Sequence, residues 1–219
     1  MADTPLLNGP SVPPLNGEAA TSIVILLHGY GSNGADLIGL VPYWREALPG
    51  TLFLAPNAPQ VCPGSPGGYQ WWAINRADPG ARAMGLLDAA PALNAFIDHH
   101  RDTHGLSDSK VALVGFSQGT MMALHVGPRR AEPLAGIIGY SGLLADADAL
   151  SAEVKSRPPV LLVHGDADPV IPMTALATAQ TGLERAGLSV QSHLSPRLGH
   201  SIDGAGLALG CDFLVSRLS

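Results

Sequence analysis

Six short aliphatic segments recur along the chain, and their repetition limits the folds that the chain can adopt. They are rich in aliphatic and β-branched residues, and most of them end in Gly, Pro or Ser. Segments that are apolar on both faces are typical of buried parallel strands. The six are SIVILLHG (22–29), TLFLAPN (51–57), KVALVGFS (110–117), LAGIIGYS (134–141), PVLLVHG (159–165) and LSVQSHL (188–194).

Helical patterns lie between and after these segments, at about 84–104, 118–127, 173–186 and 204–218. In the first pattern an apolar stripe lies opposite polar residues, among them Asn94, Asp98 and Arg101, which we expect to face solvent. Strands that alternate with helices predict a mainly parallel sheet covered by helices on both faces, so the fold class is α/β. No change of composition marks a second domain, so residues 22–219 are predicted to form a single domain.

Two segments depart from this alternation. Residues 1–21 contain Pro, Gly and Asn in quantity and are predicted to form an irregular leader or a short edge hairpin. Residues 58–80 are rich in Pro and Gly, include Trp71 and Trp72, and are too long for an ordinary connection. Loops of this length are usually functional.

Composition and charge argue against several classes of protein. The net charge of −6 provides no basic surface for nucleic acid or an anionic membrane. The longest purely aliphatic run, Ile23–Leu27, is far below the ~18 residues that a membrane-spanning helix needs. The first residues lack a signal-peptide pattern, and Cys62 and Cys211 are interpreted as free thiols rather than a disulfide. We therefore expect a cytoplasmic protein with no nucleic-acid partner and no stable membrane insertion.

The pentapeptide GFSQG (115–119) lies where a predicted strand passes into a predicted helix. A sharp turn at this point projects its central side chain above the sheet, and glycines two positions to either side relieve the crowding. Ser117 could instead cap the helix, as serines often do. The strand–turn–helix context favours a nucleophile, which needs a base within hydrogen-bond distance.

His200 is the predicted base, because it alone among the histidines lies in a loop after the last strand and before the final helix. The imidazole then needs an acid to fix its tautomer. Asp166 and Asp168 in HGDAD (164–168) follow another strand, and either could serve by position. The order of serine, aspartate and histidine along the chain is that of α/β-hydrolases.

Two backbone N–H groups are predicted to form an oxyanion hole. One belongs to Gln118, directly after the nucleophile, and the other to Tyr30 in HGYG (28–31), which follows an earlier strand. The alternative for HGYG is a simple tight turn.

Together these residues resemble the serine carboxylesterase/phospholipase family of α/β-hydrolases, which includes the acyl-protein thioesterases; the bacterial carboxylesterase branch is the most similar. The resemblance runs from about Ser22 to the C-terminus. Its motifs are LLHGYGSNGADL, FLAPNAPQVCPGSPGGYQWWAI, VGFSQGTMMALHVG, YSGLL, VHGDADPVIP and LGHSI.

The resemblance implies an α/β-hydrolase fold, compact and without a large cap domain. It assigns Asp168 to the triad and leaves Asp166 a role in shaping the loop. It also places Trp71 and Trp72 in a segment over the active site, as substrate-binding residues, although tryptophans of this kind can equally be core residues. Relatives are often dimers, but no feature of the sequence specifies an interface.

The resulting expectation is a carboxylesterase without metal or cofactor that acts on small-molecule esters with small to medium acyl chains, through an acyl-enzyme intermediate. The alternative activities are acyl-protein thioesterase and lysophospholipase. A different class of function is a non-catalytic binding protein with the hydrolase fold.

Overall fold

The computed structural model describes residues 6–74 and 80–219. Part of the predicted leader (1–5) and part of the predicted loop (75–79) therefore lie outside the described residues. None of the helices in the described ranges is long and apolar enough to cross a lipid bilayer.

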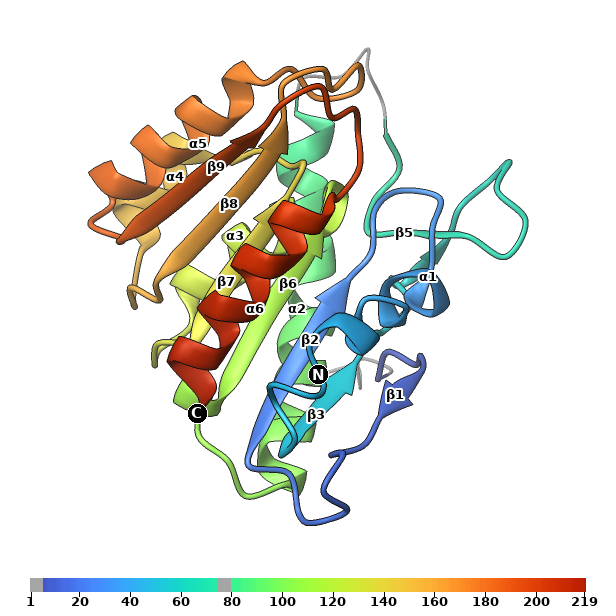
Figure 1. The fold of residues 1–219 in the computed structure, drawn as a ribbon. Coiled ribbons are helices and arrows are strands. Elements are labelled where there is room, and N and C mark those ends of the chain that lie inside the picture. Colours follow the sequence, from blue (N-terminus) through green and yellow to red (C-terminus); the bar gives the residue numbers. More distant parts are fainter. Residues whose placement is uncertain (1–5, 75–79) are drawn as a thin grey trace.

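A seven-stranded sheet forms the centre of the molecule (Figure 1), in the order β1-β3-β2-β6-β7-β8-β9. All neighbours in the sheet are parallel except β1 and β3. The strands are β1 (Ser11–Val12), β2 (Ser22–Leu27), β3 (Thr51–Leu54), β6 (Val111–Phe116), β7 (Gly136–Tyr140), β8 (Val160–Gly165) and β9 (Val190–Ser195). Each of the six aliphatic segments coincides with one of these strands, although β9 extends one residue beyond its segment, and this confirms the predicted α/β class.

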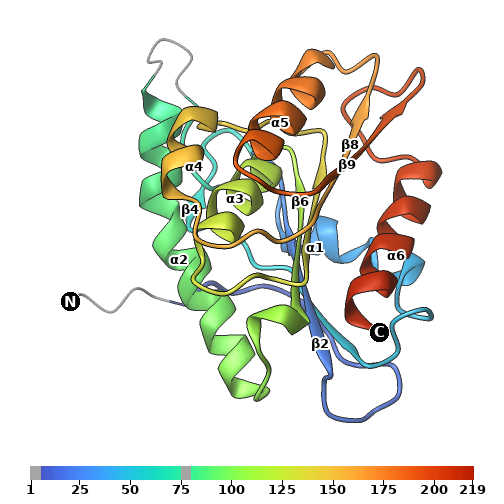
Figure 2. The same cartoon turned by 90° about the vertical axis from the view of Figure 1, so that its left-hand side faces the viewer.

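The helices cover both faces of the sheet. They are α1 (Gly34–Ile38), α2 (Ala81–Thr103), α3 (Gln118–Val126), α4 (Ala147–Glu153), α5 (Thr174–Arg185) and α6 (Gly204–Leu218), with 3₁₀ turns η1 (Val41–Tyr43), η2 (Asp108–Lys110) and η3 (Gly127–Arg129). Figure 2 shows α2, α3, α4 and α5 on one side of the sheet, and α1 and α6 on the other. The short α1 and α4 were not predicted from the sequence.

Alternating side chains of the central strands pack into two cores. Ile23, Ile25 and Leu27 of β2 belong to the core under α2 to α5, whereas Val24 and Leu26 belong to the core under α1 and α6. All five are fully buried. Burial of one such side chain stabilises the fold by about 1.5–3 kcal/mol. Because both faces of these strands are buried, their residues are apolar on both faces.

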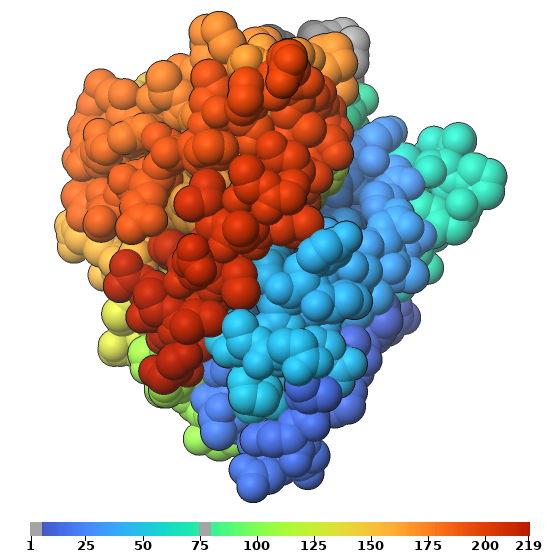
Figure 3. Space-filling view, in the orientation of Figure 1, coloured from blue at the N-terminus to red at the C-terminus, as the bar shows by residue number. Residues whose placement is uncertain are grey.

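The second core joins distant parts of the chain. In Figure 3, α6 lies beside the segment that contains α1 and η1 on the visible face. The indole N–H of the buried Trp44 donates to the carbonyl of Leu207 in α6 at 3.0 Å. This bond attaches α6 to the residue that follows η1.

Residues before β2 add an edge strand. β1 pairs antiparallel with β3, with Ser11 opposite Leu54 and Val12 opposite Phe53. It therefore extends the sheet beside β3 and forms no hairpin with β2. A separate two-stranded sheet, β4 (Gln60–Val61) and β5 (Tyr69–Gln70), lies in the segment after β3.

The polar side of α2 corrects one expectation. Asn94 and Asp98 do not simply face solvent: they accept hydrogen bonds from the buried Arg130 at 2.9 and 2.7 Å. Arg130 and Arg101 both also bind the buried Asp108. Burial alone would raise the pKa of Asp108, but hydrogen bonds from the two guanidinium groups outweigh it and lower that pKa. This buried ion-pair network attaches α2 to the segments on either side of β6 and α3.

Candidate active site

Ser117 lies between the end of β6 and the start of α3, with φ 53° and ψ −113°. A positive φ is costly for a residue with a Cβ atom, by about 1–3 kcal/mol, so the surrounding structure must hold it. One restraint is the bond from Ser117 N–H to the carbonyl of Tyr140 on β7, at 2.9 Å. The Ser117 side chain makes no capping hydrogen bond to α3, contrary to the helix-cap alternative.

Two glycines allow this turn. A Cβ on Gly119 would lie 1.9 Å from the Leu27 carbonyl oxygen, and one on Gly115 would lie 2.4 Å from the backbone nitrogen of Thr120. Neither position has room for a side chain. Gly119 therefore lets the start of α3 pack directly on the end of β2, and Gly115 lets α3 fold back against the end of β6.

His200 connects Ser117 to Asp168. The distance from His200 Nδ1 to Asp168 Oδ2 is 2.7 Å, and from His200 Nε2 to Ser117 Oγ it is 3.0 Å. A carboxylate only accepts, so Nδ1 carries the proton and donates to Asp168, which leaves the Nε2 lone pair free to accept from the Ser117 hydroxyl. This arrangement can remove a proton from the serine and stabilise the imidazolium that forms.

The Asp168 carboxylate is held on every side. Its side chain is fully buried, and Oδ1 accepts the backbone N–H groups of Val170 and Ile171 at 2.8 and 2.9 Å. Burial would raise the pKa of Asp168, but the hydrogen bonds from His200, Ile171 and Val170 together lower it. His164 lies 3.4 Å from Oδ2 and bonds the Ile171 carbonyl at 2.9 Å. Asp168 is therefore ionised when it orients His200.

Asp166 occupies a different place. Its Oδ1 accepts the backbone N–H of Arg197 at 2.5 Å, and its own N–H donates to the Ser195 carbonyl at 3.0 Å. Arg197 has φ 59°, so Asp166 stabilises an unusual turn in the loop that leads to His200. The structure thus brings Asp168, and not Asp166, to the histidine.

The predicted oxyanion donors lie on either side of the serine. Gln118 is the first residue of α3, and Tyr30 lies in the loop after β2. A Cβ on Gly29 would be 3.2 Å from the Cβ of Ser117, so this loop touches the nucleophile turn. Neither the Tyr30 nor the Gln118 backbone N–H donates to another described residue. Both N–H groups are thus free for a substrate oxyanion.

The two tryptophans are buried. Trp71 has no exposed surface and Trp72 is 6% exposed. Full burial argues against direct contact between the Trp71 indole and a substrate. A substrate-binding role for Trp72 remains a prediction.

Comparison with known proteins identifies the family. The model of the phospholipase/carboxylesterase family matches residues 14–216. The chain belongs to this family. It is 30% identical to acyl-protein thioesterase 1 of Neurospora crassa, over 94% of this chain and 92% of the relative. It is 26% identical to esterase YpfH of Escherichia coli, over 90% of this chain and 83% of the relative.

A solved structure agrees with this assignment. The crystal structure of esterase PE8 superposes with a TM-score of 0.93 at 46% sequence identity, covering 97% of this chain and 100% of PE8. This phospholipase/carboxylesterase family member is therefore an esterase- or thioesterase-type hydrolase with the α/β-hydrolase fold. The described residues form no large cap domain over the sheet.

Two residues that support the site of this family member were missed from the sequence. Ser141, directly after β7, has φ 47°, and its hydroxyl donates to the carbonyl of Ser201 at 3.1 Å. The Tyr140 hydroxyl donates to the carbonyl of Gly206 in α6 at 3.0 Å. The Ser141 bond holds the loop that carries His200, and the Tyr140 bond holds the start of α6, which follows this loop. The signal available in the sequence was the motif YSG at a strand end.

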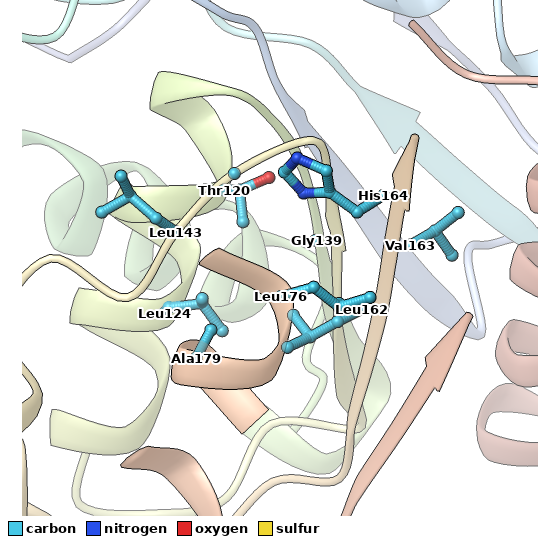
Figure 4. Close-up of a pocket in the computed structure, with 10 residues that line it drawn as sticks. Thr120, Leu124, Gly139, Leu143, Leu162, Val163, His164, Leu176 and Ala179 are labelled. Carbon is cyan, nitrogen blue, oxygen red and sulfur yellow. The ribbon is translucent and has the colours of Figure 1, made fainter. Parts of the chain in front are cut away.

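A small cavity lies behind the nucleophile turn (Figure 4), among residues of α3, α5, β7 and β8. Thr120 and His164 point toward each other across it, and Leu162 and Leu176 supply apolar walls. Its volume of about 10 Å³ is room for one water molecule at most. This cavity is therefore too small to hold the acyl chain of a substrate.

Within residues 6–74 and 80–219, no group of three or more His, Cys, Asp or Glu side chains is placed to hold a metal ion. Cys62 and Cys211 are both free.

The contact at Gly119 predicts an unusual effect of alanine. Gly→Ala within a helix normally stabilises by up to about 1 kcal/mol. We expect Gly119→Ala instead to destabilise by about 1–3 kcal/mol, because its methyl group overlaps the Leu27 carbonyl. We also expect kcat for p-nitrophenyl butyrate to fall about 100-fold, because the turn is displaced. Chemical denaturation and steady-state kinetics measure both.

Gly204→Ala is the matched control, because Gly204 is also a helix residue but has open space at its Cβ position. It should leave stability equal or slightly higher and kcat unchanged. If Gly119→Ala behaved like this control, the nucleophile turn would not depend on the close contact with β2.

Proposed function

We propose that the protein is a carboxylesterase that hydrolyses carboxylic esters of small to medium acyl chains through an acyl-enzyme on Ser117. The observation that carries the proposal is the continuous hydrogen-bonded series from Ser117 through His200 to Asp168, with distances of 3.0 and 2.7 Å. The 46% identity to esterase PE8 supports an ester rather than a thioester as the preferred substrate.

Acylation begins when His200 Nε2 removes the hydroxyl proton of Ser117 and Oγ attacks the ester carbonyl carbon. The negative charge that develops on the carbonyl oxygen accepts hydrogen bonds from the backbone N–H groups of Tyr30 and Gln118. The tetrahedral intermediate then breaks the carbon–oxygen bond to the alcohol, and His200 returns the proton to the leaving oxygen. Asp168 keeps the imidazole oriented and stabilises its protonated form.

Deacylation repeats these steps with water. Nε2 of His200 removes a proton from a water molecule, which attacks the acyl-enzyme carbonyl, and the same two N–H groups hold the oxyanion. The acid leaves when the carbon–oxygen bond to Ser117 breaks and His200 returns the proton to Oγ. No step requires a metal ion or a cofactor.

A second candidate activity is acyl-protein thioesterase or lysophospholipase. Its support is the 30% identity to the Neurospora crassa thioesterase over nearly the whole chain. Val170 and Met173, two and five residues after Asp168, are 60% and 49% exposed. Apolar side chains so near the triad could contact a longer acyl chain.

A cytoplasmic location is part of the proposal. The free Cys62 and Cys211 are consistent with a reducing compartment.

Substitutions of the three residues test the assignment. We expect Ser117→Ala to lose about 10⁶-fold in kcat and Asp168→Asn about 10³–10⁴-fold for p-nitrophenyl butyrate. Asp166→Asn is the matched control, with the same change of charge in the same loop, and should retain activity far better. A fluorophosphonate probe should label the wild type but not Ser117→Ala. Wild-type activity in Ser117→Ala, or a larger loss at Asp166 than at Asp168, would contradict the assignment.

A panel of acyl chain lengths separates the two candidate activities. We expect kcat/KM to be highest for acetyl to hexanoyl esters and to fall steeply for palmitoyl esters, thioesters and lysophospholipids. The measurement is initial-rate kinetics with one leaving group across the ester series, and a thiol-detecting assay for the thioesters. A maximum at long chains, or a preference for palmitoyl thioesters, would favour the second candidate.

A further inference from the structure

Two oxyanion donors on different elements must keep a fixed separation. The Gln118 N–H is at the start of α3, and the Tyr30 N–H is in the loop after β2. Electrostatic stabilisation of an oxyanion depends on donors that are already in place before the charge develops. A connection between these two elements would therefore contribute directly to catalysis.

The side chain of Gln118 makes the first part of such a connection. Its Oε1 accepts the backbone N–H of Trp71 at 2.9 Å, and its Nε2 donates to the backbone carbonyl of Trp72 at 2.9 Å. Gln118 is 98% buried, and both ends of its carboxamide are hydrogen-bonded. The backbone at Trp71 is thus attached to the residue that supplies one oxyanion donor.

The Trp71 side chain makes the second part. Its indole N–H donates to the backbone carbonyl of His28 at 3.0 Å, and its ring lies 6.0 Å from the His28 ring, centroid to centroid. Trp71 is fully buried, so water does not compete for this bond. Trp71 is therefore bonded both to Gln118 at the start of α3 and to His28 in the segment after β2.

His28 extends the connection to the donor itself. Its Nε2 accepts the backbone N–H of Ala58 at 2.9 Å, so the proton is on Nδ1, which donates to the Gly29 carbonyl at 2.7 Å. Burial lowers the pKa of His28, which keeps it neutral in this role. The Gly29 carbonyl and the Tyr30 N–H belong to the same trans peptide and point in opposite directions. Holding the carbonyl inward directs the N–H outward.

We propose that Trp71 is a positioning residue that joins the two oxyanion donors into one rigid unit. This inference rests on the proposed function. Core packing alone would require only an apolar ring at position 71, whereas the bond to the His28 carbonyl requires the indole N–H of a tryptophan. The role differs from substrate contact, which the full burial of the indole argues against.

Trp71→Phe tests the proposal, because it keeps an aromatic ring and removes the indole N–H. Trp44→Phe is the matched control: Trp44 is equally buried and donates an equivalent 3.0 Å bond to a backbone carbonyl, but in the core on the other face of the sheet. We expect both variants to lose similar stability. Only Trp71→Phe should lower kcat for p-nitrophenyl butyrate, by about 10–100-fold with KM nearly unchanged.

The rate of labelling by a fluorophosphonate gives a second readout. Attack on this probe also develops negative charge on an oxygen in the oxyanion hole, so the labelling rate constant should fall in parallel with kcat. Gln118→Met removes both carboxamide bonds while keeping the backbone N–H, and should act in the same direction. In the double variant, the fold-reduction in kcat should be smaller than the product of the reductions caused by Trp71→Phe and Gln118→Met alone, because the two residues act as one unit.

The outcomes separate the two proposals. An active wild type that depends on Ser117, with kcat unchanged in both Trp71→Phe and Gln118→Met relative to Trp44→Phe, would overturn the positioning role alone. If Trp71→Phe did not fold, the kcat of Gln118→Met would decide. A wild type without esterase or thioesterase activity, or one whose activity survives Ser117→Ala, would overturn the proposed function and the positioning role together.

Discussion

The close packing of α3 against the end of β2 is the constraint on which the site depends. Gly119 lies against the Leu27 carbonyl, where no side chain fits, and Gly29 lies close to Ser117, where a Cβ would make a tight contact. This packing forces the strained turn that exposes Ser117 and brings the loop of Tyr30 beside the first turn of α3. The proposed nucleophile and the two proposed oxyanion donors therefore depend on the close approach of α3 to the end of β2 and to the loop that follows it.

The parallel sheet then determines which other residues can reach the serine. β2, β6, β7, β8 and β9 run in the same direction, so the segments that follow them meet at one edge (Figure 1). Asp168 follows β8 and His200 follows β9, and each is fixed by bonds to neighbouring backbone. The Val170 and Ile171 N–H groups hold Asp168, and the Ser141 hydroxyl holds the loop next to His200. Such restraints pre-organise a triad.

The fold was predictable from the sequence wherever burial determines residue type. A strand covered on both faces must be apolar throughout, so segments such as 22–29 and 159–165 indicated the sheet and its class. The ends of strands indicated Ser117 and His200 but left Asp166 and Asp168 as alternatives, and only the resemblance to the family selected Asp168. The short α1 and α4 were not predictable, because elements of one or two turns owe their stability to tertiary contacts rather than to periodicity.

Hydrogen bonds between polar groups that are far apart in the sequence leave no pattern of residue types that could predict them. Asn94 and Asp98 have the spacing of a solvated helix face, yet they bind Arg130, more than thirty residues away. The Gln118 carboxamide and the Trp71 indole bind backbone groups at similar separations. A backbone partner has no residue-type signature, so only the structure reveals that Gln118 contributes a side chain as well as an N–H.

Trapping the acyl-enzyme intermediate is the most direct test of whether Ser117 is the nucleophile. The enzyme would be mixed with p-nitrophenyl butyrate, quenched in acid within milliseconds, and examined by intact-mass and peptide mass spectrometry. We expect a butyryl adduct on the peptide that contains Ser117, with a burst of p-nitrophenol if deacylation is the slower step. An adduct on another residue, or turnover without any adduct even when deacylation is slowed, would contradict it.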